Sequence, residues 1–143
     1  MIVQVENQGE TKLYESSTPK IEVSLKFDKG DKVKVINAGC CYTSHTWAMN
    51  YFGISPEDLY DRDREGIGWT EDDGQVYDVI NVCLNVNPMC EPLYLIHCEK
   101  GYLIIGEDGI KFFNHAYQRR AEYRNETGIS NLKSVYVLHD TKN

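Results

Sequence analysis

Five short stretches of the chain are rich in β-branched and aromatic residues, and each is bounded by Gly, Asp or Asn. They are residues 32–37, 75–86, 93–98, 102–106 and 110–113. Branched and aromatic side chains fit a pleated strand, and the bounding residues favour turns. Several short strands separated by turns are typical of a small twisted β-barrel. The sequence therefore constrains the architecture more strongly than the function.

Further elements are predicted on both sides of these stretches. Strands are expected at residues 2–6, 11–15, 21–27 and 135–139, and a helix from Asn114 to about Asn125. The first two would form a hairpin, with Gly9 supplying the left-handed position of its turn. Residues 21–27 alternate strictly between apolar and polar side chains, which indicates a half-buried strand.

The strand pattern disappears over residues 38–74. Thr43 or Ser44 can cap a helix there that Gly53 ends, and the sequence of residues 55–58, Ser-Pro-Glu-Asp, is typical of a second helix start. Loops of this length in compact domains tend to be functional or disordered. The aromatic residues in this loop favour an ordered one.

Composition places the chain among soluble globular proteins. With 143 residues, 41% of them hydrophobic, it can build one core without disulfides. We expect a single domain over residues 1–143, with a core at about 29–113, an N-terminal β extension at 1–28 and a C-terminal helix and strand at 114–143. No basic leader followed by a long apolar stretch opens the chain, so the expected location is the cytoplasm.

Most of the negative charge lies in one segment. Residues 57–73 hold eight acids and two arginines, so this segment carries −6 of the chain's net charge of −7. A nucleic-acid-binding protein needs a basic stripe to displace counterions from phosphates, so direct nucleic-acid binding is not expected. The segment favours a basic protein surface as its partner, and no membrane contact is predicted.

The order of strands resembles an SH3-like barrel with a long first loop. More narrowly, GDKVKVINAG at 30–39, YTSHTWA at 42–48 and YLIIGEDGI at 102–110 resemble small phage and prophage proteins of unknown role. The resemblance covers roughly residues 29–113. It implies a mainly β fold with short helices (α+β), built on an SH3-like β-barrel, in a virus-encoded protein that works inside the host cell. It implies no catalytic residues.

A thiol nucleophile is one alternative. Cys41 lies next to Cys40 and close to His45, and a neighbouring base can activate a thiol for hydrolysis. No oxyanion stabiliser or orienting residue is identifiable from the sequence. We therefore expect a non-enzymatic protein, with a thiol-dependent hydrolase using Cys41 and His45 as the competing hypothesis.

Metal binding is a further alternative. Cys83, Cys90 and Cys98, with His97 beside the last, lack the short Cys-x2–4-Cys spacing of most zinc sites. Five cysteines cannot all pair with each other, and unpaired cysteines commonly behave as small buried hydrophobic residues. The cluster Asp72-Asp73-Gly74 lacks the full spacing of a calcium loop. No metal and no cofactor is predicted.

Aromatic residues beside acids form the strongest functional pattern. Aromatic rings supply contact area, and carboxylates steer a cationic partner. The residues predicted to bind the partner are Tyr42, Trp47, Tyr60, Asp61, Asp63, Trp69, Asp72 and Asp73. We expect them to dock on a basic surface of a host protein, such as a nucleic-acid-processing enzyme, and to inhibit or modulate it. A virion or assembly component is the remaining alternative.

Overall fold

The computed structural model describes residues 2–7, 10–15, 21–85, 91–126, 133–136 and 138–140, with side chains for residues 25–83 and 92–123. Its centre is a five-stranded antiparallel sheet in the order β7-β6-β5-β4-β8. The strands are β4 (Lys32–Val35), β5 (Tyr77–Asn85), β6 (Glu91–Cys98), β7 (Gly101–Gly106) and β8 (Ile110–Phe112). All five central strands of the sequence prediction are present, and the fold is mixed α+β.

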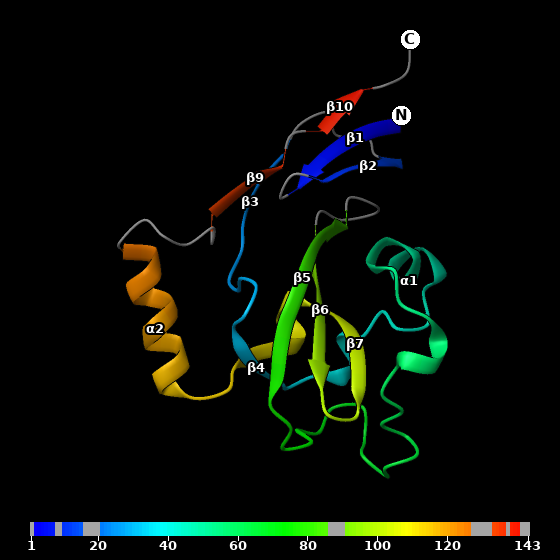
Figure 1. Cartoon of the computed structure of the whole chain (residues 1–143), viewed down its shortest axis with the longest axis vertical. Helices are drawn as coiled ribbons and strands as arrows, with labels where there is room; N and C mark the ends of the chain where they lie inside the picture. Colours follow the sequence, from blue (N-terminus) through cyan, green and yellow to red (C-terminus); the bar gives the residue numbers. More distant parts are fainter. Residues whose placement is uncertain are drawn as a thin grey trace.

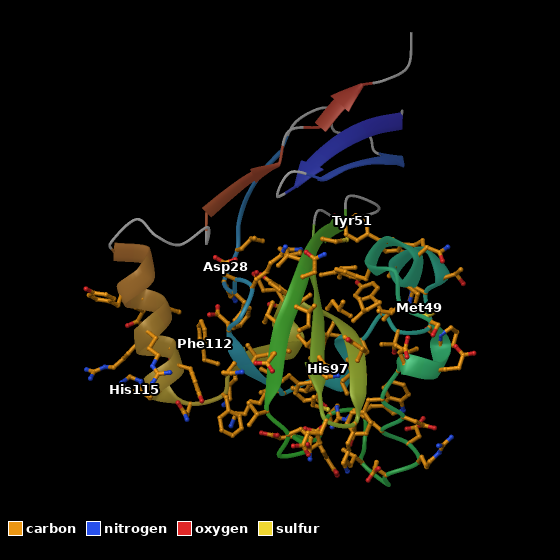
Figure 2. All side chains as sticks on the ribbon, in the orientation of Figure 1. Asp28, Met49, Tyr51, His97, Phe112 and His115 are labelled. Atoms are coloured by element: carbon orange, nitrogen blue, oxygen red, sulfur yellow. The ribbon has the colours of Figure 1, made fainter. Side chains whose placement is uncertain are left out.

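The sheet is buried on both faces along β6. Leu93 and Leu95 pack in one cluster, whereas Tyr94 and Ile96 pack in the other. Helix α1 (Thr46–Phe52) covers the first face, and Figure 2 labels Met49 and Tyr51, which pack against it. Burial on both faces explains why residues 93–96 are continuously apolar rather than alternating.

The second face holds the larger cluster. Val33 and Val35 are fully buried there. The ring of Phe27 packs edge-on against Tyr94, with ring centroids 5.5 Å apart, and lies 4.9 Å from the ring of Phe112. Figure 2 shows Phe112 between β4 and helix α2. Aromatic packing of this kind adds to the stabilisation that burial alone gives.

A closed SH3-like barrel is not confirmed. The five-stranded sheet is open, because β7 and β8 are its two edges and do not pair within the described residues. The chain after β4 does return to the free edge of β7. Cys41 forms an isolated antiparallel bridge with Ile105, and the Tyr42 N–H donates to the Ile104 carbonyl at 2.7 Å. One bridge and one such bond do not amount to a closing ladder.

The two ends of the chain pair with each other. Strands β1 (Ile2–Asn7) and β2 (Glu10–Glu15) form the predicted hairpin, and β10 (Leu138–Asp140) pairs with β1. Figure 1 shows this small sheet beyond one end of the central sheet. Gly9 of the predicted turn lies outside the described residues.

Two strand predictions need correction. The strand predicted at 21–27 ends early, as β3 (Ile21–Ser24), and Leu25 and Phe27 instead enter the core. The strand predicted at 135–139 is two short strands, β9 (Lys133–Tyr136) and β10. These strands lie in different sheets, because β9 pairs with β3 and β10 pairs with β1.

The C-terminal helix is as predicted. Helix α2 spans His115–Glu126, and the Asn114 side-chain oxygen accepts from the Tyr117 N–H at 3.2 Å, as a helix cap does. Ala121 is buried on its inner face. Figure 1 shows α2 on the opposite side of the sheet from α1. Within the described residues, no helix combines the length and the apolar character needed to cross a bilayer.

The long loop is mostly turns. It contains the 3-10 turns η1 (Ala38–Cys40) and η2 (Pro56–Asp58) on either side of α1, and a third turn, η3 (Glu107–Gly109), joins β7 to β8. The second helix predicted at 55–58 is therefore a single turn. Helix α1 ends at Gly53, as predicted, with a left-handed φ of 70°.

Candidate binding site in the long loop

Residues 57–73 are held against β7 by backbone contacts. Leu59 forms a parallel bridge with Tyr102, and the Tyr60 N–H donates to the Tyr102 carbonyl at 3.0 Å. The Lys100 ammonium, in the turn before β7, lies 2.8 Å from the Glu65 carboxylate. The sheet therefore anchors the first half of this acidic segment.

A buried ion pair holds the second half. The side chain of Arg62 is only 7% exposed and that of Asp73 is fully buried, and the Arg62 Nε lies 3.7 Å from Asp73 Oδ2. The Arg62 Nη2 donates to the Glu71 carbonyl, and the Tyr77 hydroxyl donates to Asp73. Breaking such a pair leaves an uncompensated buried charge, so each partner keeps the other in place.

Asp73 therefore has a structural position. It was predicted to contact a partner, but its buried carboxylate holds the loop to Arg62 and Tyr77 and presents no charge to solvent. Asp72, beside it, is half-exposed and lies 3.5 Å from the Lys34 ammonium. Of these two neighbouring acids, only Asp72 can reach a partner.

The other predicted acids lie on the surface. Asp61 lies 3.6 Å from the Arg64 guanidinium, and both side chains are largely exposed. Exposed pairs of this kind contribute little free energy, so Asp61 remains available to another cation. Glu57 and Asp63 are exposed and have no ion pair within the described part of the chain.

The predicted aromatic residues divide into two groups. Trp69 is 62% exposed and Trp47, on α1, is 37% exposed. Tyr60 is buried, and Tyr42 is half-buried, with its ring 5.0 Å from that of His45. Trp69 is thus the large aromatic surface of the acidic segment, while Tyr60 forms part of its inner side.

A pocket of about 420 Å³ lies inside the long loop. Ala38, Cys41 and Leu103 contribute apolar surface to it, and Tyr60 and Arg62 contribute buried polar groups. On the exposed side its lining includes Trp69, Glu57, Asp61, Asp63 and Arg64. The loop therefore brings together Tyr60, Asp61, Asp63 and Trp69 of the predicted site around one pocket, but neither Trp47 nor Asp72 lines it.

Three polar groups of residues that line this pocket are buried and form no hydrogen bond within the described part of the chain. They are the Tyr60 hydroxyl and the Nε and Nη1 of Arg62. Burial raises the pKa of Tyr60 above its ordinary value of 10.0, which by itself leaves the hydroxyl protonated at neutral pH. The wall of the pocket thus includes buried N–H and O–H donors that form no hydrogen bond with the described residues, which is unusual for buried groups.

The thiol of Cys41 lines the same pocket as a neutral group. Burial raises its pKa from 9.0 to about 11, although the nearby Arg62 lowers it. No hydrogen bond joins Cys41 to the exposed His45 within the described residues. This environment does not generate a thiolate, the reactive form that the hydrolase hypothesis requires. That hypothesis, like the non-enzymatic one, stays a prediction.

The metal alternatives find no support in the described residues. Residues 25–83 and 92–123 contain no group of three His, Cys, Asp or Glu side chains that could hold a metal ion. Cys83 and Cys98 are buried and Cys40 is partly buried, and none of the three forms a disulfide bond within the described residues. Cys90 lies outside the described residues.

Sequence reasoning missed the role of Arg62. A basic residue inside an acidic run is usually a solvated side chain, and nothing in the local pattern distinguishes Arg62 from the exposed Arg64 two residues later. Only the approach of Asp73 and the Glu71 carbonyl makes its burial favourable.

No protein-family model, curated protein or solved structure matches this chain.

Proposed function

We propose that this protein is a non-catalytic binding protein that docks on a basic protein surface through the outer side of its long loop. The docking surface consists of Glu57, Asp61, Asp63 and Trp69. One observation carries the proposal: a tryptophan that is 62% exposed lies beside carboxylates that line the same pocket. Large exposed aromatic residues are common anchors of protein interfaces.

The anchoring of the loop supports this assignment. Arg62 and Asp73 fix the loop from inside, and Leu59 fixes it to β7. A loop that is already ordered loses little conformational entropy when it binds, so more of the contact free energy remains as affinity. The acids that stay outside attract a cationic partner and set the salt dependence of binding.

The sequence resemblance suggests the setting. We propose an open variant of the SH3-like barrel as the scaffold, because the chain after β4 returns to the edge of β7 at Cys41 and Tyr42. The protein would then be phage-encoded and act in the cytoplasm of the host cell. A host enzyme that processes nucleic acid is a suitable target, since its basic groove binds phosphates by the same electrostatics that would bind these carboxylates. Occupying that groove would inhibit the enzyme.

Charge-neutralising variants test the proposal. The double variant Glu57→Gln/Asp63→Asn removes two exposed carboxylates that have no ion pair in the described residues. The control Glu99→Gln/Glu122→Gln removes two exposed carboxylates outside the loop. Each protein is immobilised and used to capture partners from a host lysate at several salt concentrations, followed by mass spectrometry.

We expect the wild type and the control to retain the same basic protein, with retention falling as salt rises. The loop variant should retain less of it and show a weaker salt dependence. Equal capture by all three proteins would refute the role of the loop. Capture of only acidic or uncharged partners would refute the predicted chemistry of the partner.

A further inference from the structure

The buried donors of Arg62 and Tyr60 at the loop pocket can each bind a further hydrogen-bond acceptor. Arg62 Nε, Arg62 Nη1 and the Tyr60 hydroxyl are buried and form no hydrogen bond with any described residue. Leaving donors unpaired away from water costs free energy, and an oxygen acceptor in the pocket would remove that cost. The Arg62 side chain is more than nine-tenths buried and is one of the residues that line the pocket. Its Nε lies on the side of Asp73, so Nη1 is the Arg62 donor that remains for a bound molecule.

The charges around the pocket indicate that this acceptor is neutral. The Arg62 guanidinium is already balanced by Asp73, 3.7 Å away. The remaining charged lining residues are Glu57, Asp61, Asp63 and Arg64, which together are negative. A bound carboxylate or phosphate would meet this excess of negative charge, whereas a carbonyl oxygen would not. The same excess attracts a cation to the exposed side.

The size and the exposed ring fit a short peptide segment. A volume of about 420 Å³ is within the usual range of small-ligand sites. Trp69 lies at the exposed side of the pocket, and the face of an indole ring attracts lysine and arginine cations. A backbone carbonyl next to a basic side chain would therefore meet complementary groups both inside the pocket and at its edge.

We propose that this pocket binds a short basic peptide segment of the docking partner. One backbone carbonyl of the segment accepts hydrogen bonds from Arg62 and Tyr60. The adjacent lysine or arginine side chain lies along Trp69, with its cation near Asp61 and Asp63. This inference rests on the proposed function and adds to it the chemical class of the bound segment.

The direct test uses blocked tripeptides, which carry no terminal charges. The full-length protein is titrated with acetyl-glycyl-lysyl-glycinamide and, separately, with acetyl-glycyl-glutamyl-glycinamide, while NMR follows the indole N–H of Trp69 and the Nε–H of Arg62. The lysyl peptide should shift both signals in a saturable way, and the glutamyl peptide should shift neither. Equal binding of the two peptides would overturn the predicted charge preference. The absence of any saturable shift would mean that only water fills the pocket.

The variant Tyr60→Phe tests the hydroxyl alone, and Tyr123→Phe, at an exposed site on α2, is the matched control. Loss of one hydrogen bond should weaken binding of the lysyl peptide about three- to tenfold. The same variant should not lower the melting temperature, because the hydroxyl forms no hydrogen bond with the described residues of the free protein. Unchanged affinity in Tyr60→Phe would overturn the assigned role of this hydroxyl.

The two proposals fail in distinguishable ways. If capture of a basic partner depends on Glu57 and Asp63 but the lysyl peptide does not bind, the docking surface stands and the pocket assignment is wrong. If the lysyl peptide binds but the loop variant captures partners as well as the wild type does, the pocket assignment stands and the docking surface is wrong.

Discussion

Gly101 lies directly against the backbone of Asp58. Its φ is +138°, and a Cβ built on it would be 2.8 Å from the Asp58 carbonyl oxygen and 2.9 Å from the Tyr60 nitrogen. Both distances are shorter than real Cβ contacts allow, and both neighbours are backbone atoms that belong to the acidic segment. The position of this segment on β7 therefore depends on the absence of a side chain at residue 101.

Gly101→Ala should displace the acidic segment from β7 and lower the free energy of unfolding by about 1–3 kcal/mol, the usual range for overpacking. Gly74→Ala is the control, because Gly74 also has a positive φ, of 70°, but a Cβ there would meet nothing within 4 Å. Urea denaturation gives the stabilities, and hydrogen exchange reports the Tyr60 N–H. Retained protection of that N–H in Gly101→Ala would contradict the close approach.

Asp73→Asn should be much more destabilising than Asp72→Asn. The first variant leaves the buried Arg62 guanidinium without its counter-charge, which typically costs about 3–5 kcal/mol. The second removes a half-exposed pair with Lys34, which is typically worth about 0–1 kcal/mol. Urea denaturation of both variants measures the difference. Similar stabilities would mean that the Arg62–Asp73 pair does not hold the loop.

The strands could be predicted because their signals are local. Branched residues such as Val33 and Val35 lie between turn residues, and Asn114 and Gly53 mark helix ends by their own chemistry. These features depend on a few neighbouring residues and do not require knowledge of the fold. The same local pattern predicted the hairpin formed by residues 2–7 and 10–15.

Other features depend on distant residues. Helix α1 begins after His45 rather than after Thr43 or Ser44, and the preceding chain is tied to β7 by the bond from the Tyr42 N–H to Ile104. The burial of Arg62 likewise requires Asp73, which the fold brings beside it. No single strand of the sequence shows that β7 and β8 remain unpaired edges of an open sheet. For this reason the acidic segment could be identified from the sequence, but the sequence did not show which of its residues are buried and which are exposed.

Alkylation should separate the structural and catalytic interpretations of Cys41. At a pH well below 9, a pKa of about 11 in the folded protein instead of 9.0 reduces the thiolate fraction about a hundredfold. A thiolate of higher pKa is intrinsically more nucleophilic, which offsets part of this loss, so iodoacetamide should label Cys41 roughly ten- to a hundredfold more slowly in the native protein than in urea. Peptide mass spectrometry at several reaction times gives the two rates. Faster labelling of Cys41 in the native protein than in urea would favour a catalytic thiol.

The same thiol should make the fold less stable in alkaline solution. Its pKa is raised on folding, so above about pH 9 the unfolded chain loses this proton while the folded protein keeps it up to about pH 11. The folded state then binds one more proton, and this group's contribution to the free energy of unfolding falls by about 1.4 kcal/mol per pH unit. Cys41→Ser has no thiol to titrate, so its stability should fall less steeply than that of the wild type. Urea denaturation between pH 9 and about 10, a range below the pKa of most tyrosines, gives the free energy of unfolding of both proteins as a function of pH. If the two free energies fell equally steeply, folding would not raise the pKa of the Cys41 thiol.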